Sequence, residues 1–372
     1  MTSNSGLARL WTWANSLRWR GRLAYQRTSR FWIYRLRSSR FGAFCARVGG
    51  RIKSLRRKNR RRGTRIAQMS EFREIGAADL LATWLGLPEI WRNDTQIATL
   101  ILKHFLSEEW LFKHVDQDAT RPGPLTLTGS PTDIEHAKIR VVELAESIFN
   151  LQKIENVHEC LNRLRTADDI EPTIAELHVG KMIYANEWPF VFVVPSPGRT
   201  YDFEIQYGEW KVAADVKRKI DSPTPNVRGI TKALSRSRTQ LPKDGPGIFF
   251  VKLPQQWMEY PDWQRTSVQG ALDFLRGTGR VSSLAFYLEP IHLLDFVAET
   301  GRHYVASQGH YFHEVANPNR RYGKDLDWKL FEKWRPTDYS SWSALPPKYV
   351  RLFEFPRGPL EALRREQQER AT

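Results

Sequence analysis

The sequence predicts an α/β protein of the α+β kind, with a mixed β-sheet flanked by helices and a helical region before it. Apolar residues recur at helical spacing over residues 75–165, and the alternation typical of strands begins only after residue 166. A hydrophobic content of 41% and an aromatic content of 12% are enough to bury one large core or two small ones. This composition excludes intrinsic disorder for the body of the chain.

The N-terminal tail, residues 1–68, differs in composition from the rest. Its first 65 residues hold 19 basic side chains and no acidic one, which leaves 38 basic against 41 acidic side chains in residues 66–372. The net charge of +16 therefore comes from the tail, and the body is close to neutral.

Three interpretations of this Arg- and Trp-rich tail remain open. It is a disordered anchor for nucleic acid or an anionic membrane, because guanidinium groups pair with phosphate and indole rings stack on bases. Alternatively it is a transit peptide, since such peptides are rich in Arg and poor in acids. The third interpretation, which we favour, is a mis-assigned start: the composition becomes ordinary at once after Met69.

The helical region covers residues 69–165. Two sets of apolar residues at helical spacing predict helices on either side of Pro88: Leu80, Leu81, Trp84 and Leu85, then Ile97, Leu100, Ile101 and Phe105. Thr132 and Glu135 form a capping box, which predicts the start of a third helix.

From residue 166 the pattern alternates between helices and strands. The predicted elements are, in order, a helix over 174–184, strands over 190–194, 201–207 and 210–217, a helix over 229–241, a strand over 248–251, a helix over 266–275 and a strand over 284–288. The first six give the order αβββαβ. We assign residues 166–300 to one domain with this core, and residues 301–372 to a C-terminal extension packed on it.

The second and third predicted strands form a hairpin. Gly208-Glu209 separates two alternating runs, and glycine at the first position of a two-residue loop is typical of a type II′ turn. A loop of this length places Asp202 opposite Asp215. Alternation then gives an apolar face and a charged face; the charged face holds Asp202, Glu204, Gln206, Asp215 and Lys217.

The opposed aspartates predict a metal site. Directly opposed carboxylates repel each other unless a positive charge lies between them. Carboxylate oxygens and water suit a hard cation such as Mg²⁺, and Lys217 could orient a water or stabilise developing charge. Such a group of residues is suited to phosphodiester hydrolysis.

This segment resembles the PD-(D/E)XK nuclease superfamily, which has the restriction-endonuclease-like fold. The resemblance rests on Glu176 in the first helix, Asp202, the pair Asp215-Val216-Lys217 and the αβββαβ order, and it covers residues 166–255. It implies a metal-dependent endonuclease acting on DNA, with Mg²⁺ or Mn²⁺ held by the three acids and a catalytic role for Lys217. It also suggests Gln240 as an accessory polar residue, with Glu204 as another. One departure is Tyr201, where the family motif has proline.

Two other interpretations of the same residues stay open. The acid-x-Lys pattern is not specific, because it also occurs as Glu209-Trp210-Lys211 and Asp327-Trp328-Lys329. Asp215 and Lys217 could therefore belong to an ion-pair ladder on an exposed sheet face. Glu176 could then be a solvated acid on its helix. The chain could also keep the fold without the activity, as a catalytically inactive nucleic-acid-binding or scaffold protein.

Several classes of protein are not indicated. Two cysteines, Cys45 and Cys160, cannot form a disulfide framework, so we expect a cytoplasmic protein of a reducing compartment. No run approaches the roughly 18 apolar residues of a membrane span. The sequence lacks the glycine-rich motifs of nucleotide-binding loops and the G-x-S-x-G motif of esterases.

Overall fold

The computed structural model describes residues 73–89, 92–115, 123–196, 200–217, 224–298, 301–308, 311–322, 345–346 and 348–353. The predicted tail and Asp327-Trp328-Lys329 lie outside the described residues. The chain divides into two compact units, Met1–Phe72 with Leu85–Asn93 and Arg73–Trp84 with Asp94–Thr372. The sheet, its helices and the sites described below belong to the second unit.

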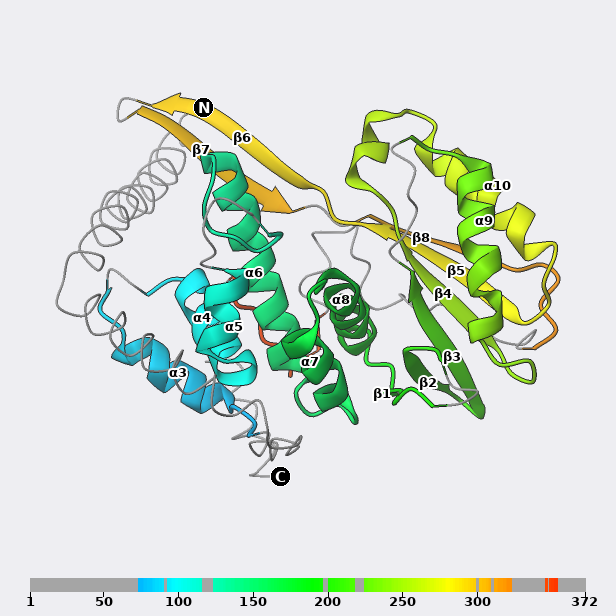
Figure 1. Cartoon of the computed structure of the whole chain (residues 1–372), viewed down its shortest axis with the longest axis horizontal. Coiled ribbons are helices and arrows are strands. Elements are labelled where there is room, and N and C mark those ends of the chain that lie inside the picture. Colours follow the sequence, from blue (N-terminus) through cyan, green and yellow to red (C-terminus); the bar gives the residue numbers. More distant parts are fainter. Residues whose placement is uncertain are drawn as a thin grey trace, which may run out of the picture. The chain divides into compact units, whose positions relative to one another are not determined.

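Among the described residues six helices precede the sheet, and α4 to α8 form a packed group. Their bounds are α3 (Ala77–Gly86), α4 (Asp94–Leu106), α5 (Glu108–His114), α6 (Pro131–Leu151), α7 (Val157–Thr166) and α8 (Glu171–Ala185). Helix α6 packs against α4 and α8, and α7 packs against α8 (Figure 1). No helix in the described ranges is long and apolar enough to cross a membrane.

A mixed six-stranded sheet follows, with the strand order β1-β2-β3-β4-β5-β8. Its strands are β1 (Phe190–Phe192), β2 (Phe203–Tyr207), β3 (Trp210–Lys217), β4 (Gly247–Lys252), β5 (Val281–Leu288) and β8 (Tyr311–Ala316). β1, β2 and β3 pair antiparallel, β3, β4 and β5 pair parallel, and β8 is antiparallel to β5. β6 (Ile291–Ala298) and β7 (Gly301–Gln308) form a separate antiparallel pair (Figure 1).

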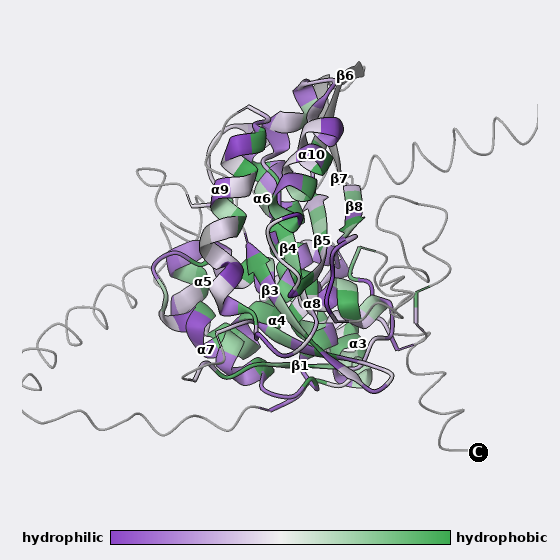
Figure 2. Cartoon of the chain, turned by 90° about the vertical axis from the view of Figure 1, so that its right-hand side faces the viewer, coloured by the Kyte–Doolittle hydropathy of each residue, from purple (hydrophilic) through white to green (hydrophobic). Residues whose placement is uncertain are grey.

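Helices cover both faces of the sheet. On one face, α9 (Val227–Ser237) and α10 (Trp263–Leu275) close a core that includes Ile230 and Phe274 of the helices and Ala213 and Phe249 of the strands. On the other face α8 packs closely, since a Cβ at Gly180 would lie 3.2 Å from the Phe192 ring. In Figure 2 the strands β3 and β4 carry the hydrophobic colour, and α9 and α10 carry stretches of hydrophilic colour. The chain is thus an α/β protein with a mixed sheet flanked by helices, as predicted.

The predicted hairpin is confirmed. Gly208-Glu209 is the two-residue loop, Tyr207 pairs with Trp210 and Phe203 with Ala214, and Gly208 has a φ of 56°. A positive φ at this loop position is the reason for glycine. The ladder ends at Phe203, so Asp202 lies one residue before β2.

The cap of α6 differs from the prediction. Ser130 and Asp133, not Thr132 and Glu135, form the capping box, and Pro131 is the first helical residue. Proline suits the first position of a helix, because its fixed φ is already helical and the missing N–H would have no partner there. The predicted capping box therefore lies two residues C-terminal to the observed one.

Candidate active site

Asp215 and Lys217 lie on one face of the last three residues of β3. Asp215 is 1% exposed, and its Oδ2 lies 2.5 Å from Nζ of Lys217, whose side chain is 21% exposed. Residues at i and i+2 of a strand share a face, so this ion pair follows from the strand geometry. Lys217 thus connects a buried carboxylate to the surface.

Asp202, just before β2, is hydrogen-bonded to β3. Its backbone N–H donates to the carbonyl of Ala214 at 2.9 Å, and its Oδ2 accepts a 2.7 Å bond from the N–H of Val216. The charge of Asp202 also raises the pKa of Asp215, as expected of two carboxyl groups that lie close together.

Glu176 of α8 completes the group of acids. Its Oε2 accepts from the guanidinium group of Arg163 on α7, and the Cys160 thiol lies 3.8 Å from the same oxygen. The Glu176 side chain is only 13% exposed. The charge of Asp202 raises the pKa of Glu176 and also that of Asp215, so Asp202 lies within electrostatic reach of both other acids.

The pKa values of these acids rise because the site is buried. Burial raises the pKa of Asp215 to about 8, with the Asp202 charge adding to the shift and Lys217 opposing it. Burial likewise raises the pKa of Glu176 to about 7, helped by Asp202 and opposed by Arg163. For Asp202, burial raises the pKa against the hydrogen bond from Val216. At neutral pH the site therefore holds protons on groups that are ionised in water.

The three acids carry the oxygen donors that a hard divalent cation prefers. In the part of the chain that the structure describes, no group of three or more His, Cys, Asp and Glu side chains has the geometry to hold a metal ion. The Glu176 carboxylate is paired with Arg163, and the pKa of Asp215, about 8, keeps that group protonated at neutral pH. A carboxyl group that holds a proton can exchange it for a cation, because metal ligands must be deprotonated.

The two accessory residues lie elsewhere. The carboxylate of Glu204 pairs with Lys211 at 2.9 Å and lines a cavity of about 600 Å³ beside β1. Gln240 ends a 3₁₀ turn, η2 (Arg238–Gln240), and its carbonyl accepts from the Thr200 hydroxyl at 3.4 Å. Among the described contacts, none joins either side chain to the three acids.

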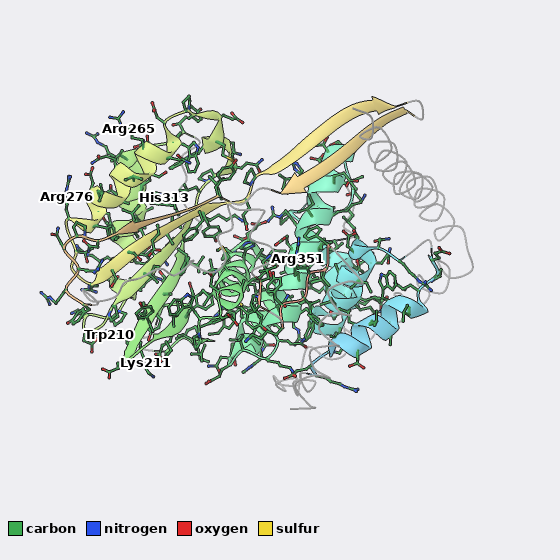
Figure 3. The ribbon with its side chains drawn as sticks, turned by 180° about the vertical axis from the view of Figure 1, so that it is seen from behind. Trp210, Lys211, Arg265, Arg276, His313 and Arg351 are labelled. Atoms are coloured by element: carbon green, nitrogen blue, oxygen red, sulfur yellow. The ribbon has the colours of Figure 1, made fainter. Side chains whose placement is uncertain are left out.

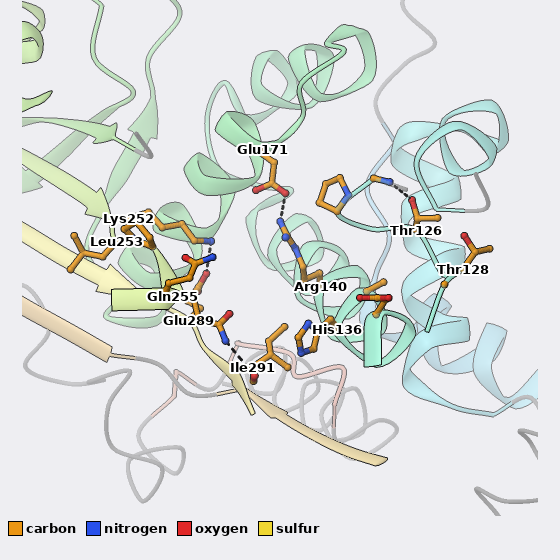
Figure 4. Close-up of a pocket in the computed structure, with 17 residues that line it drawn as sticks. Thr126, Thr128, His136, Arg140, Glu171, Lys252, Leu253, Gln255, Glu289 and Ile291 are labelled. Carbon is orange, nitrogen blue, oxygen red and sulfur yellow. Dashed lines mark hydrogen bonds and ion pairs between the residues drawn. The ribbon is translucent and has the colours of Figure 1, made fainter. Parts of the chain in front are cut away.

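A second cavity, of about 680 Å³, opens where β4 and β5 end (Figure 4). Two ion pairs line it: Arg140 with Glu171, and Lys252 with Glu289 at 2.9 Å. Glu289 also meets His178 of α8. Since these lining cations are already paired with carboxylates, the cavity offers no strong attraction for an anion.

Sequence reasoning missed Arg163, Cys160 and the residues of this second cavity. Arg163 lies 13 positions before Glu176, and Lys252 lies 37 positions before Glu289. Such separations leave no short motif, and only the packing of α7 against α8 brings the first pair together.

Comparisons with known proteins add no identification: no family model matches the chain, and neither a curated protein nor a solved structure matches it.

Proposed function

We propose that the chain is a metal-dependent endonuclease that hydrolyses phosphodiester bonds in DNA. The observation that carries the proposal is the group formed by Asp202, Asp215 and Lys217 at the end of β3, with Glu176 within electrostatic reach. The order α8-β1-β2-β3-α9-β4 supports it, because it is the αβββαβ order of the PD-(D/E)XK resemblance. The restriction-endonuclease-like core is part of this proposal.

Each residue has a role in the proposed reaction. Asp202, Asp215 and Glu176 would hold Mg²⁺ or Mn²⁺, which supplies a water of lowered pKa and neutralises charge on the phosphate. Release of Glu176 from Arg163 would make its carboxylate available as a ligand. Lys217 lies beside Asp215 with part of its side chain exposed, so its ammonium group can contact a phosphate oxygen and stabilise charge that develops in the transition state.

One alternative has an observation in its favour. The ion pair that Arg163 makes with Glu176 blocks the third acid, as expected of an inactive relative that keeps the fold. A catalytically inactive nucleic-acid-binding or scaffold protein would bind DNA without cleaving it in any divalent metal. The exposed ion-pair ladder has less support, since Asp215 is 1% exposed and the Glu176 side chain is 13% exposed.

Cleavage of a supercoiled plasmid tests the proposal. We expect the full-length protein to nick or linearise the plasmid in Mg²⁺ or Mn²⁺ and not in EDTA. Asp215→Asn and Lys217→Ala should each lower the rate by at least a hundredfold, because each removes an interaction with the reacting centre. Thermal unfolding of the variants checks that the fold is intact.

Lys211→Ala is the matched control. Lys211 belongs to the neighbouring match Glu209-Trp210-Lys211 on the same strand, but its side chain is 69% exposed and pairs with Glu204. This variant should cleave at the rate of the unaltered protein. Cleavage that survives EDTA, or that is equally fast in Lys217→Ala and Lys211→Ala, would contradict the proposal.

A further inference from the structure

Helix α9 carries a stripe of basic residues, Arg228, Lys232 and Arg236, four positions apart, which we call the α9 basic stripe. A spacing of four keeps all three positions on one side of a helix. Ile230 and Leu234, on the opposite side, are fully buried in the core under α9. Arg228 and Lys232 are exposed. The helix therefore turns one apolar side to the sheet and one basic side to solvent.

The surroundings do not neutralise the stripe. Residues 224–243 hold five basic side chains and no acidic one, in a body that is otherwise close to neutral. No ion pair joins Arg228 or Lys232 to any residue among those described. On the neighbouring α10, Asp273 is paired with Arg276 at 3.0 Å, while Asp262 before its first turn is exposed. Arg265 and Arg276 of α10 are exposed as well (Figure 3).

The topology places the start of the stripe at the end of β3. A helix that connects two parallel neighbouring strands runs back antiparallel to them. The far end of α9 lies beside the start of β5, because Arg280 donates to the carbonyl groups of Arg238 and Leu241 at 3.4 and 3.2 Å. Arg228, at the other end, therefore lies towards the edge where Asp215 and Lys217 end β3.

We infer that the α9 basic stripe binds the phosphate backbone of duplex DNA next to the Asp215 and Lys217 site, an inference that rests on the proposed function. Eight residues of helix separate Arg228 from Arg236, which is about 12 Å along the helix axis. That length matches the rise of three to four phosphates of one DNA strand, at about 3.4 Å each. Because phosphate contacts carry no sequence information, the stripe supplies affinity and register rather than sequence specificity.

The salt dependence of DNA binding tests the inference. The probe is a fluorescent duplex of fixed sequence, titrated with full-length protein in EDTA at several NaCl concentrations, so that no cleavage occurs. Each phosphate contact contributes about 0.9 to the slope of log K against log salt. The slope of Arg228→Ala/Lys232→Ala should therefore be smaller in magnitude by about 1.8 than that of the unaltered protein.

Lys103→Ala/Lys153→Ala is the control, because it removes the same charge from exposed positions on the helical side of the molecule. Its slope of log K against log salt should equal that of the unaltered protein. Any contribution of the basic tail to this slope is the same in every variant, because the tail is unchanged. Equal slopes for the two double variants, or no salt-dependent binding at all, would overturn the inference. Plasmid cleavage, measured separately in Mg²⁺ or Mn²⁺, separates this inference from the proposed function: a protein that never cleaves can still show the loss of slope.

Discussion

Asp215 is an acidic residue that is only 1% exposed to solvent. Burial of an ionised carboxylate is costly, so the group keeps its proton well above the ordinary pKa of 3.8, to about 8. Lys217 lowers this cost without cancelling it, because the Asp202 carboxyl group is also close. Such a conflict between neighbouring acids is common at catalytic sites and is rare at positions selected for stability alone.

The raised pKa predicts a stability that falls with pH. Between about pH 4 and pH 8, folded Asp215 holds a proton that the unfolded chain has released, so the free energy of unfolding decreases as pH rises across this window. Asp215→Asn has no such proton to lose. Urea unfolding in EDTA at pH 5.5, 7 and 8.5 should therefore show a steeper decline for the unaltered protein than for Asp215→Asn. Equal declines would mean that Asp215 titrates in its ordinary range.

At the scale of elements, α9 and α10 pack through a glycine. A Cβ at Gly270 would lie 2.9 Å from Cβ of Ile230, closer than real contacts allow. Gly270→Ala should therefore push the helices apart and lower the free energy of unfolding by about 1–3 kcal/mol, the usual cost of overpacking. Chemical denaturation measures this.

Gly86→Ala is the control for that change. It adds the same methyl group at the end of α3, where a Cβ would meet no described atom within 4 Å. Its stability should stay within about 0.5 kcal/mol of the unaltered protein, as is usual for surface substitutions. A Gly270→Ala protein as stable as Gly86→Ala would show that α9 and α10 are not closely packed.

The elements differ in how far the sequence predicts them. The β2–β3 hairpin was predicted residue by residue, because a two-residue loop fixes the register and Gly208 marks that loop. The pair of β6 and β7 was not predicted at all. The contact of Arg163 with Glu176 could not be foreseen either, since it depends on how α7 packs against α8. Local chemistry thus predicts strand register, whereas contacts between helices need the tertiary structure.

For the molecule as a whole, buried polar contacts connect the helical layer to the sheet and hold α8 in place. Lys181 of α8 forms an ion pair with Glu143 of α6, and the His178 ring contacts the Glu289 carboxylate after β5. The C-terminal segment joins the same network, since the Tyr349 hydroxyl donates to Glu146 at 2.6 Å. Because α8 also carries Glu176, this network fixes the position of the third acid relative to β3.

The charge of the whole chain is a weaker guide to function than the place of a few residues. The net charge of +16 belongs to the tail, which lies outside the described residues. In the described part, by contrast, Arg228 and Lys232 are exposed on α9, the helix that follows β3. The sequence predicts the order of elements and the four residues Glu176, Asp202, Asp215 and Lys217, but not the burial that raises the pKa values of the three acids.

Binding of Mn²⁺ to the full-length protein tests the central claim most directly. Titration calorimetry at pH 7, in two buffers of different ionisation enthalpy, reports both binding and the protons released. Because Asp215, with a pKa of about 8, and Glu176, with a pKa of about 7, must both be deprotonated to become ligands, we predict release of between one and two protons per Mn²⁺ at pH 7 and much less at pH 9. Asp215→Asn should not bind. Equal Mn²⁺ affinity in Asp215→Asn, or no binding to the unaltered protein at millimolar Mn²⁺, would contradict the account.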